Sequence, residues 1–215
     1  MVSGDNFVYE LEAKNQASIQ RVVDALTLAL GKDGVEVADA LRFAVKGAIE
    51  MAEVAALWIT DCADLEMKLS LAEQCGDSAR QCRRLSERLA ALGAPIYDPR
   101  DGGYSKQFAF LRSLQTPEER SSAGYVTGKM LSMARLTALG SFCERLGDEE
   151  TARLFGVEIV ADERRYYESG QRMLIAAAAT EESQARARRA AYRTLELAGE
   201  TAEPLQLRRA LGRRR

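Results

Sequence analysis

Apolar residues recur at intervals of three and four positions along most of the chain, which is the spacing of an amphipathic α-helix. The alternation expected of a β-strand is absent from the sequence. The four prolines (Pro95, Pro99, Pro117 and Pro204) lie at expected boundaries, so none interrupts a long periodic segment. The pattern predicts an all-α protein. Long helices are expected over about residues 14–31, 34–59, 64–92, 117–146, 148–178 and 181–198, with short helices over about residues 106–114 and after residue 198.

Helix-start signals support these boundaries. Asp33 and Glu36 have the spacing of a capping box before the second helix. Thr116, Pro117 and Glu119 combine a capping residue, a proline at the first helical position and a glutamate that can complete the cap. These signals predict that one helix begins just after Asp33 and another just after Thr116.

Two long helical hairpins result, at residues 34–92 and 117–177, joined by a longer crossover. Two such hairpins predict a four-helix bundle with one long connection. The sequence contains no Gly/Ser linker, so we expect one domain over residues 1–215, with a core bundle at about 34–177 and C-terminal helices at about 180–213.

Two segments resemble a known family. Residues 71–93, LAEQCGDSARQCRRLSERLAALG, are similar to the second bundle helix of the ferritin-like di-iron carboxylate proteins. Residues 147–170, GDEETARLFGVEIVADERRYYESG, are similar to the fourth. The resemblance covers about residues 36–175. It implies a ferritin-like four-helix bundle of two antiparallel hairpins with extra N- and C-terminal helices, in which carboxylates and Glu-x-x-His pairs would hold two metal ions.

The metal ligands of that family are mostly missing when they are carried over position by position. Ser78 stands at a glutamate position and Gln81 at a histidine position. Met133 replaces a carboxylate, and Tyr166 replaces the second histidine. Glu163 alone is kept on its helix. The resemblance therefore implies a divergent member without a metal site.

Glu50 is the best candidate for the carboxylate of the first bundle helix, with Lys46 one turn away. Glu50 also belongs to a charged stripe with Asp39, Arg42 and Glu53. Such a stripe is typical of a solvated helix face. If the stripe faces inward instead, Lys46 and Glu50 are close enough to pair.

The chain contains no histidine. This removes the usual general base at neutral pH and the commonest nitrogen ligand of zinc, copper and non-haem iron. We expect no metal and no cofactor. The cysteines are expected to be reduced residues of the core rather than metal ligands; they are Cys62, Cys75, Cys82 and Cys143.

The former metal centre can be either a ligand pocket or a closely packed contact between helices, and the pocket is the more specific of these two interpretations. Glu163 and Tyr166 are its candidate catalytic pair, as acid and base or as polar anchors, and Tyr166 could donate a hydrogen bond to a buried Glu163. The candidate ligand-binding residues are Ser78, Gln81, Met130, Met133, Glu50 and Lys46, and Lys129 is a further candidate base. Glycines inside the helices of residues 117–178 fit such a space, although close helix packing, as at a dimer interface, is the commoner explanation for them.

Three functions remain open. The first is a ferritin-like protein that binds a small molecule in the former metal cavity and could act on it as a metal-independent enzyme of specialised metabolism. The second is a non-catalytic structural or regulatory subunit that partners an active di-metal protein. The third is an oxidase or oxygenase with a carboxylate-rich metal site. A homodimer or a partner ferritin-like subunit is expected.

Charge is unevenly distributed, with a formal net charge of −2 but nine Arg against three Glu over residues 183–215. We expect a solvated helix face there rather than a nucleic-acid site, because aromatic residues are nearly absent among the arginines. No apolar run is long enough for a membrane span, and no signal peptide is recognisable. A cytoplasmic protein is expected.

Overall fold

The structure is a computed structural model that describes residues 2–95 and 103–202. These residues form helices and connecting turns and contain no strand, which confirms the all-α prediction. The elements in chain order are α1 (Gly4–Leu30), α2 (Val37–Asp61), α3 (Leu65–Ala91), α5 (Lys106–Ser113), α6 (Pro117–Arg120), the π-helical η1 (Ser121–Thr127), α7 (Gly128–Arg145), α8 (Glu149–Arg153), the π-helical η2 (Leu154–Ile159), α9 (Val160–Ala177) and α10 (Glu181–Ala202).

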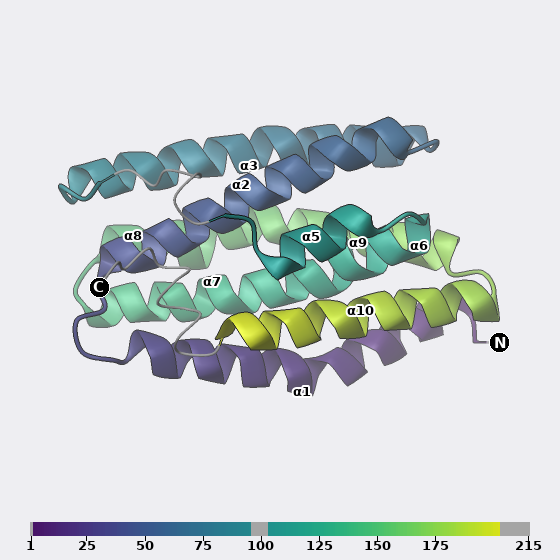
Figure 1. The fold of residues 1–215 in the computed structure, drawn as a ribbon, viewed down its shortest axis with the longest axis horizontal. Coiled ribbons are helices and arrows are strands. Elements are labelled where there is room, and N and C mark those ends of the chain that lie inside the picture. The colour runs from purple at the N-terminus through teal and green to yellow at the C-terminus, as the bar shows by residue number, and fades with distance from the viewer. Residues whose placement is uncertain (1, 96–102, 203–215) are drawn as a thin grey trace.

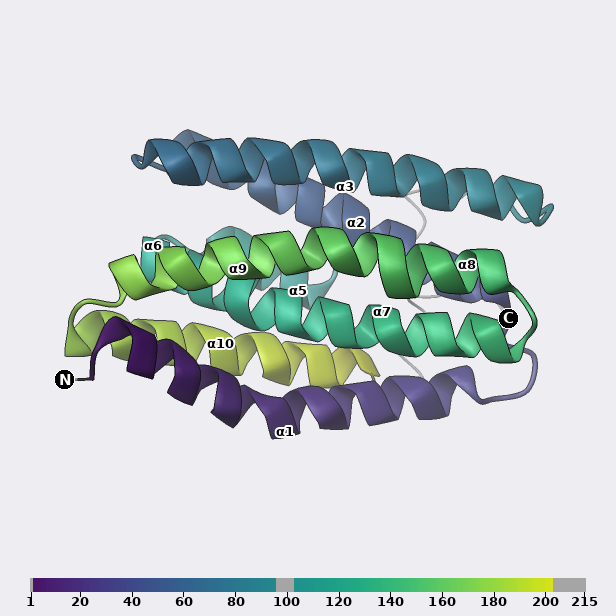
Figure 2. The ribbon, with the colours of Figure 1, turned by 180° about the vertical axis from the view of Figure 1, so that it is seen from behind.

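The long helices run roughly along one axis in three stacked pairs (Figure 1). α2 and α3 form an antiparallel hairpin on one side, and the segment from α6 to α9 forms a second hairpin in the middle. α1 and α10 pack against each other and against the far side of the second hairpin. The view from behind shows α3 lying along α9 (Figure 2). The two hairpins therefore lie where the sequence predicts them.

Three helix boundaries differ from the prediction. α1 begins at Gly4 rather than near residue 14, because Ser3 caps it and Phe7 and Leu11 are buried. α2 is capped by Glu36, with Asp39 completing the box, so it begins three residues later than the predicted cap implies. α10 continues to Ala202. The expected basic helix beyond it and most of the loop between α3 and α5 lie outside the described residues.

Each helix of the second hairpin contains a π-helical stretch, where the sequence predicts an unbroken α-helix. η1 is buried along its whole length and runs directly into α7. η2 runs directly into α9. π-helical turns are rare in proteins, and those that occur are often found at functional sites. The two stretches come just before Lys129 and Glu163, which face each other.

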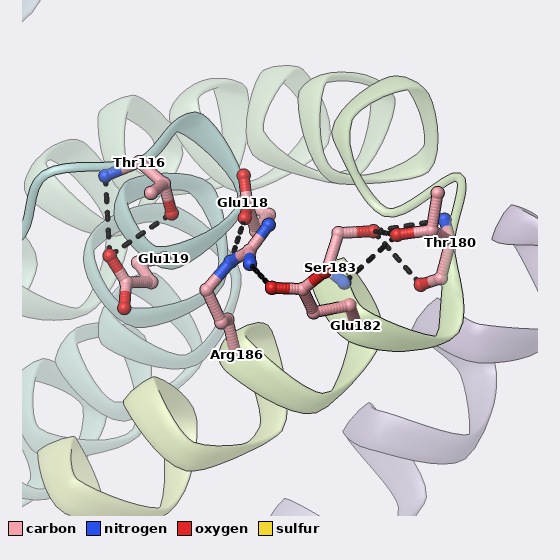
Figure 3. Close-up of polar contacts among 7 residues, drawn as sticks. All are labelled: Thr116, Glu118, Glu119, Thr180, Glu182, Ser183 and Arg186. Carbon is pink, nitrogen blue, oxygen red and sulfur yellow. Dashed lines mark hydrogen bonds and ion pairs between the residues drawn. The ribbon is translucent and has the colours of Figure 1, made fainter.

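One ion pair connects α6 and α10 at one end of the molecule, where capping contacts also stabilise the start of each helix (Figure 3). Glu119 accepts hydrogen bonds from the backbone N–H and the hydroxyl of Thr116, as predicted. The buried Glu118 accepts a hydrogen bond of 2.5 Å from Arg186 of α10. These contacts fix the start of the helix that carries η1 and α7.

The apolar core continues on both sides of the middle hairpin. Its largest cluster joins α1, α2, α7 and α10, and includes Leu26, Leu41 and Leu139. A second cluster surrounds Trp58 near the C-terminal end of α2, whereas the first contacts the N-terminal half of that helix. No helix within residues 2–95 and 103–202 has the length and apolar character needed to cross a membrane.

Candidate functional site

A cavity of about 330 Å³ lies between the two hairpins. α2 and α3 form one wall, and η1, α7 and α9 form the opposite wall. α5 and the residues just before it close one side. Gly47, Tyr104 and Lys106 are the exposed residues of the lining, so the mouth opens between α2 and the start of α5. The volume lies at the lower end of the range for small-molecule sites.

Lys129 and Glu163 form a buried ion pair in the wall of this cavity. The Lys129 Nζ and the Glu163 Oε1 are 2.9 Å apart. The two residues are only 2% and 7% exposed. The same ammonium lies 5.3 Å from the centre of the Tyr166 ring, where the face of the ring attracts a cation. Each charge needs the other, because a buried ion without a partner is strongly destabilising.

Tyr166 lies behind this pair and bonds to a different carboxylate than expected. Its hydroxyl donates a hydrogen bond of 2.5 Å to the Oδ2 of the buried Asp77 rather than to Glu163. Arg165 and Arg80 also contact the Asp77 carboxylate. Burial raises the pKa of Tyr166 to about 12, so its phenol keeps its proton at neutral pH. Tyr166 is not among the residues that line the cavity.

Glu50 faces the bundle interior, which decides between its two interpretations. Its carboxylate accepts hydrogen bonds from the backbone N–H of Ser105 at 2.7 Å and from the Ser105 hydroxyl at 2.6 Å. Ser105 is the N-cap of α5, so Glu50 holds the start of this helix against α2. Lys46 lies 4.0 Å from the same carboxylate. Burial is the main cause that raises the pKa of Glu50 above its usual value.

Six predicted site residues share the lining of this one cavity. They come from α2, α3, α7 and α9 and are Lys46, Glu50, Ser78, Gln81, Lys129 and Glu163. Ser78 and Gln81 are both buried. The Gln81 amide also donates a long hydrogen bond of 3.4 Å to Asp162 of α9. The antiparallel register that places these positions at one level is therefore present in the structure.

The two methionines that the sequence assigns to the site, Met130 and Met133, do not belong to this lining. Met130 packs into the core clusters on the side of α1. Met133 is half-buried, and its backbone carbonyl accepts a hydrogen bond from Thr137. The family resemblance assigns Met133 to the former metal centre beside Glu163, but Lys129, one turn earlier on the same helix, is the residue that contacts Glu163.

Arg135 is a lining residue that sequence reasoning missed. Its Nη2 donates a hydrogen bond of 3.3 Å to the backbone carbonyl of Ala198, and its guanidinium lies 5.9 Å from the centre of the Phe43 ring. Burial lowers the pKa of Arg135 to about 10, which leaves it charged at neutral pH. Lys129, Leu131, Ser132 and Arg135 together form the inward face of α7. The sequence alone does not mark this face, because it is recognisable only once Lys129 is known to face inward.

The residues around the cavity do not fit a di-metal centre. Within residues 2–95 and 103–202, no group of three His, Cys, Asp or Glu side chains is arranged to hold a metal ion. The Lys129 ammonium stands beside Glu163 and would repel a bound cation. The carboxylate of Glu50 is occupied by Ser105.

The cysteines are all free. The thiols of Cys75 and Cys82 on α3 lie against backbone carbonyls of α2, at Ala52 and Val45. Burial raises the pKa of Cys82 to about 11, which makes its thiolate scarce at neutral pH. This agrees with the prediction that these residues belong to the packing between α2 and α3.

Comparison with known proteins identifies no relative. No protein-family model matches the chain, and neither a curated protein nor a solved structure matches it significantly. The geometry of the cavity is therefore the basis for assigning a function.

Proposed function

We propose that this chain is a ferritin-like bundle that has lost its di-metal centre and binds a small organic molecule in the cavity between its hairpins. The observation that carries the proposal is the convergence of Glu50, Ser78, Gln81 and Glu163 on one cavity. These are positions that the family resemblance assigns to metal ligands.

The ion pair of Lys129 and Glu163 explains how such a bundle remains stable without metal. In a di-metal bundle the cations neutralise the inward carboxylates. Here the Lys129 ammonium neutralises Glu163 at 2.9 Å. Space that would hold metal ions and their bridging ligands is then left for another molecule.

The lining has the chemical character of a small-molecule site. Apolar side chains such as Met51, Leu131 and Ile159 provide contact area, and a few polar groups can fix the orientation of a ligand. Glu163 can accept a proton from a bound molecule and Lys129 can donate one, so the pair is also the candidate for metal-independent acid–base chemistry.

A neutral fluorescent probe tests the proposal. N-phenyl-1-naphthylamine, whose emission rises in apolar surroundings, should bind the wild-type protein saturably. Gly47→Phe should abolish this binding, because Gly47 lies at the mouth and a phenyl ring there would block entry. The fold should tolerate the change, because a Cβ at this position would meet no atom within 4 Å. Gly47→Ala is the matched control and should bind the probe normally. Absence of saturable binding to the wild type, or equal binding to Gly47→Phe, would refute the proposal.

A further inference from the structure

Cations outnumber carboxylates in the cavity lining. Among residues 2–95 and 103–202, four cationic side chains line it, namely Lys46, Lys106, Lys129 and Arg135, against the two carboxylates of Glu50 and Glu163. The lining thus has a formal excess of positive charge. An excess of this kind favours an anionic ligand over a neutral or cationic one.

Most of these charges already have a partner. Lys129 pairs with Glu163, and Lys106 pairs with Glu200 of α10 at 2.6 Å. Lys46 lies 4.0 Å from the Glu50 carboxylate. None of these three is available as the main anchor of an anion.

Arg135 is different, because no carboxylate in residues 2–95 and 103–202 pairs with it. A guanidinium has five N–H donors, and the contact with the Ala198 carbonyl uses only one of its nitrogens. Ser132 lies three residues earlier on the same helix face and also lines the cavity, so its hydroxyl can donate to a ligand held by Arg135. The two side chains place donors side by side in the cavity wall.

We infer that the ligand of this cavity is an organic carboxylate with an apolar body, bound through its carboxylate to Arg135 and Ser132. This inference rests on the proposed function and specifies its substrate class. A planar guanidinium matches a carboxylate with two parallel hydrogen bonds, which is the strongest polar contact that the lining offers.

The apolar body has a defined path from that anchor. Lys129 lies six residues before Arg135, or about 9 Å along the helix axis. Leu131 lies between them on the same helix and also lines the cavity. A chain or ring that starts at Arg135 and extends toward the start of α7 therefore passes over Leu131 before its far end reaches Lys129 and Glu163. This orientation brings the uncharged end of the ligand to the acid–base pair.

Competition against the bound dye tests this ligand class. Decanoate and decanol share an apolar chain and differ in the carboxylate. Decanoate should displace N-phenyl-1-naphthylamine from the wild type at concentrations at least tenfold lower than decanol does. Arg135→Met should weaken decanoate by roughly 10- to 100-fold, the range expected for lost hydrogen bonds to a charged group, and leave decanol and the dye unchanged. Arg135→Lys should recover part of the affinity.

Arg145→Met is the matched control, because Arg145 is an exposed arginine of the same helix that does not line the cavity. Decanoate affinity should be nearly unchanged in this variant. If decanoate and decanol compete equally, if neither competes, or if Arg135→Met and Arg145→Met behave alike, the inference fails while dye binding still supports the cavity. If the dye itself does not bind the wild type, the proposed function fails.

Discussion

Lys129 and Glu163 place opposite charges in a wall that is otherwise made mostly of apolar and small polar side chains. Burial makes their separation costly, because neither ion can be solvated once the other is removed. The pair therefore supports both the fold and the electrostatics of the cavity. Variants that lack one charge can be compared with a variant that lacks both charges, and this comparison measures the interaction between the two side chains.

Removing one member of the pair should cost much stability. Glu163→Leu leaves the ammonium alone, and Lys129→Met leaves the carboxylate alone, so each should lower the free energy of unfolding by about 3–5 kcal/mol. The double variant removes both charges and should be more stable than either single variant. Urea denaturation followed by circular dichroism measures all four proteins. Additive losses in the double variant would show that the two side chains do not interact.

Glu50 gives the stability a dependence on pH. Burial raises its pKa in the folded protein above the usual value of 4.5, so the folded state holds this proton more tightly than the unfolded state. The stabilisation is complete below the unfolded pKa and is lost as pH rises through the folded pKa. The Gln side chain cannot titrate. The stability of wild type relative to Glu50→Gln should therefore fall as pH rises from about 4 to 8. A relative stability that stays constant or rises would contradict this assignment.

At the scale of helices, glycines act in opposite ways at two positions. Gly47 is exposed in the middle of α2, and a Cβ there meets nothing within 4 Å. Gly170 on α9 packs directly on η1, where an added Cβ would overlap the Cβ of Tyr125. The first glycine leaves space at the mouth of the cavity, and the second allows two helices to approach closely.

These positions predict changes of opposite sign. Gly47→Ala should raise the free energy of unfolding by about 0.5–1 kcal/mol, because alanine favours the helix. Gly170→Ala should lower it by about 1–3 kcal/mol, because the core is overpacked there. Thermal unfolding of the two variants beside wild type measures both. A stabilised Gly170→Ala would show that α9 and η1 are not in the contact described.

Helices and hairpins were predictable from local signals, and several boundaries were not. Apolar periodicity and the Thr116 cap are properties of short segments. The extension of α1 to Gly4 depends on burial of Phe7 against α9 and α10, which is a tertiary contact. The π-helical η1 and η2 also depend on packing between helices, and no local residue pattern marked them.

At the scale of the molecule, antiparallel register explains why part of the site was predictable. Positions equally distant from a turn meet, and this brings Glu50, Ser78 and Gln81 to the same cavity as Glu163. A shift of one helical turn was enough to exchange Met133 for Lys129. Hydrogen-bond partners were less predictable, because Tyr166 selects Asp77 through side-chain geometry that spacing does not encode.

The most direct measurement is a crystal structure of the protein grown with N-phenyl-1-naphthylamine and Mn²⁺ together. We expect the dye between α2, α5 and α7, with the contact between Lys129 and Glu163 intact and no Mn²⁺ bound to Glu50 or Glu163. A cavity filled by Mn²⁺ on these carboxylates, or dye bound only elsewhere on the surface, would contradict it.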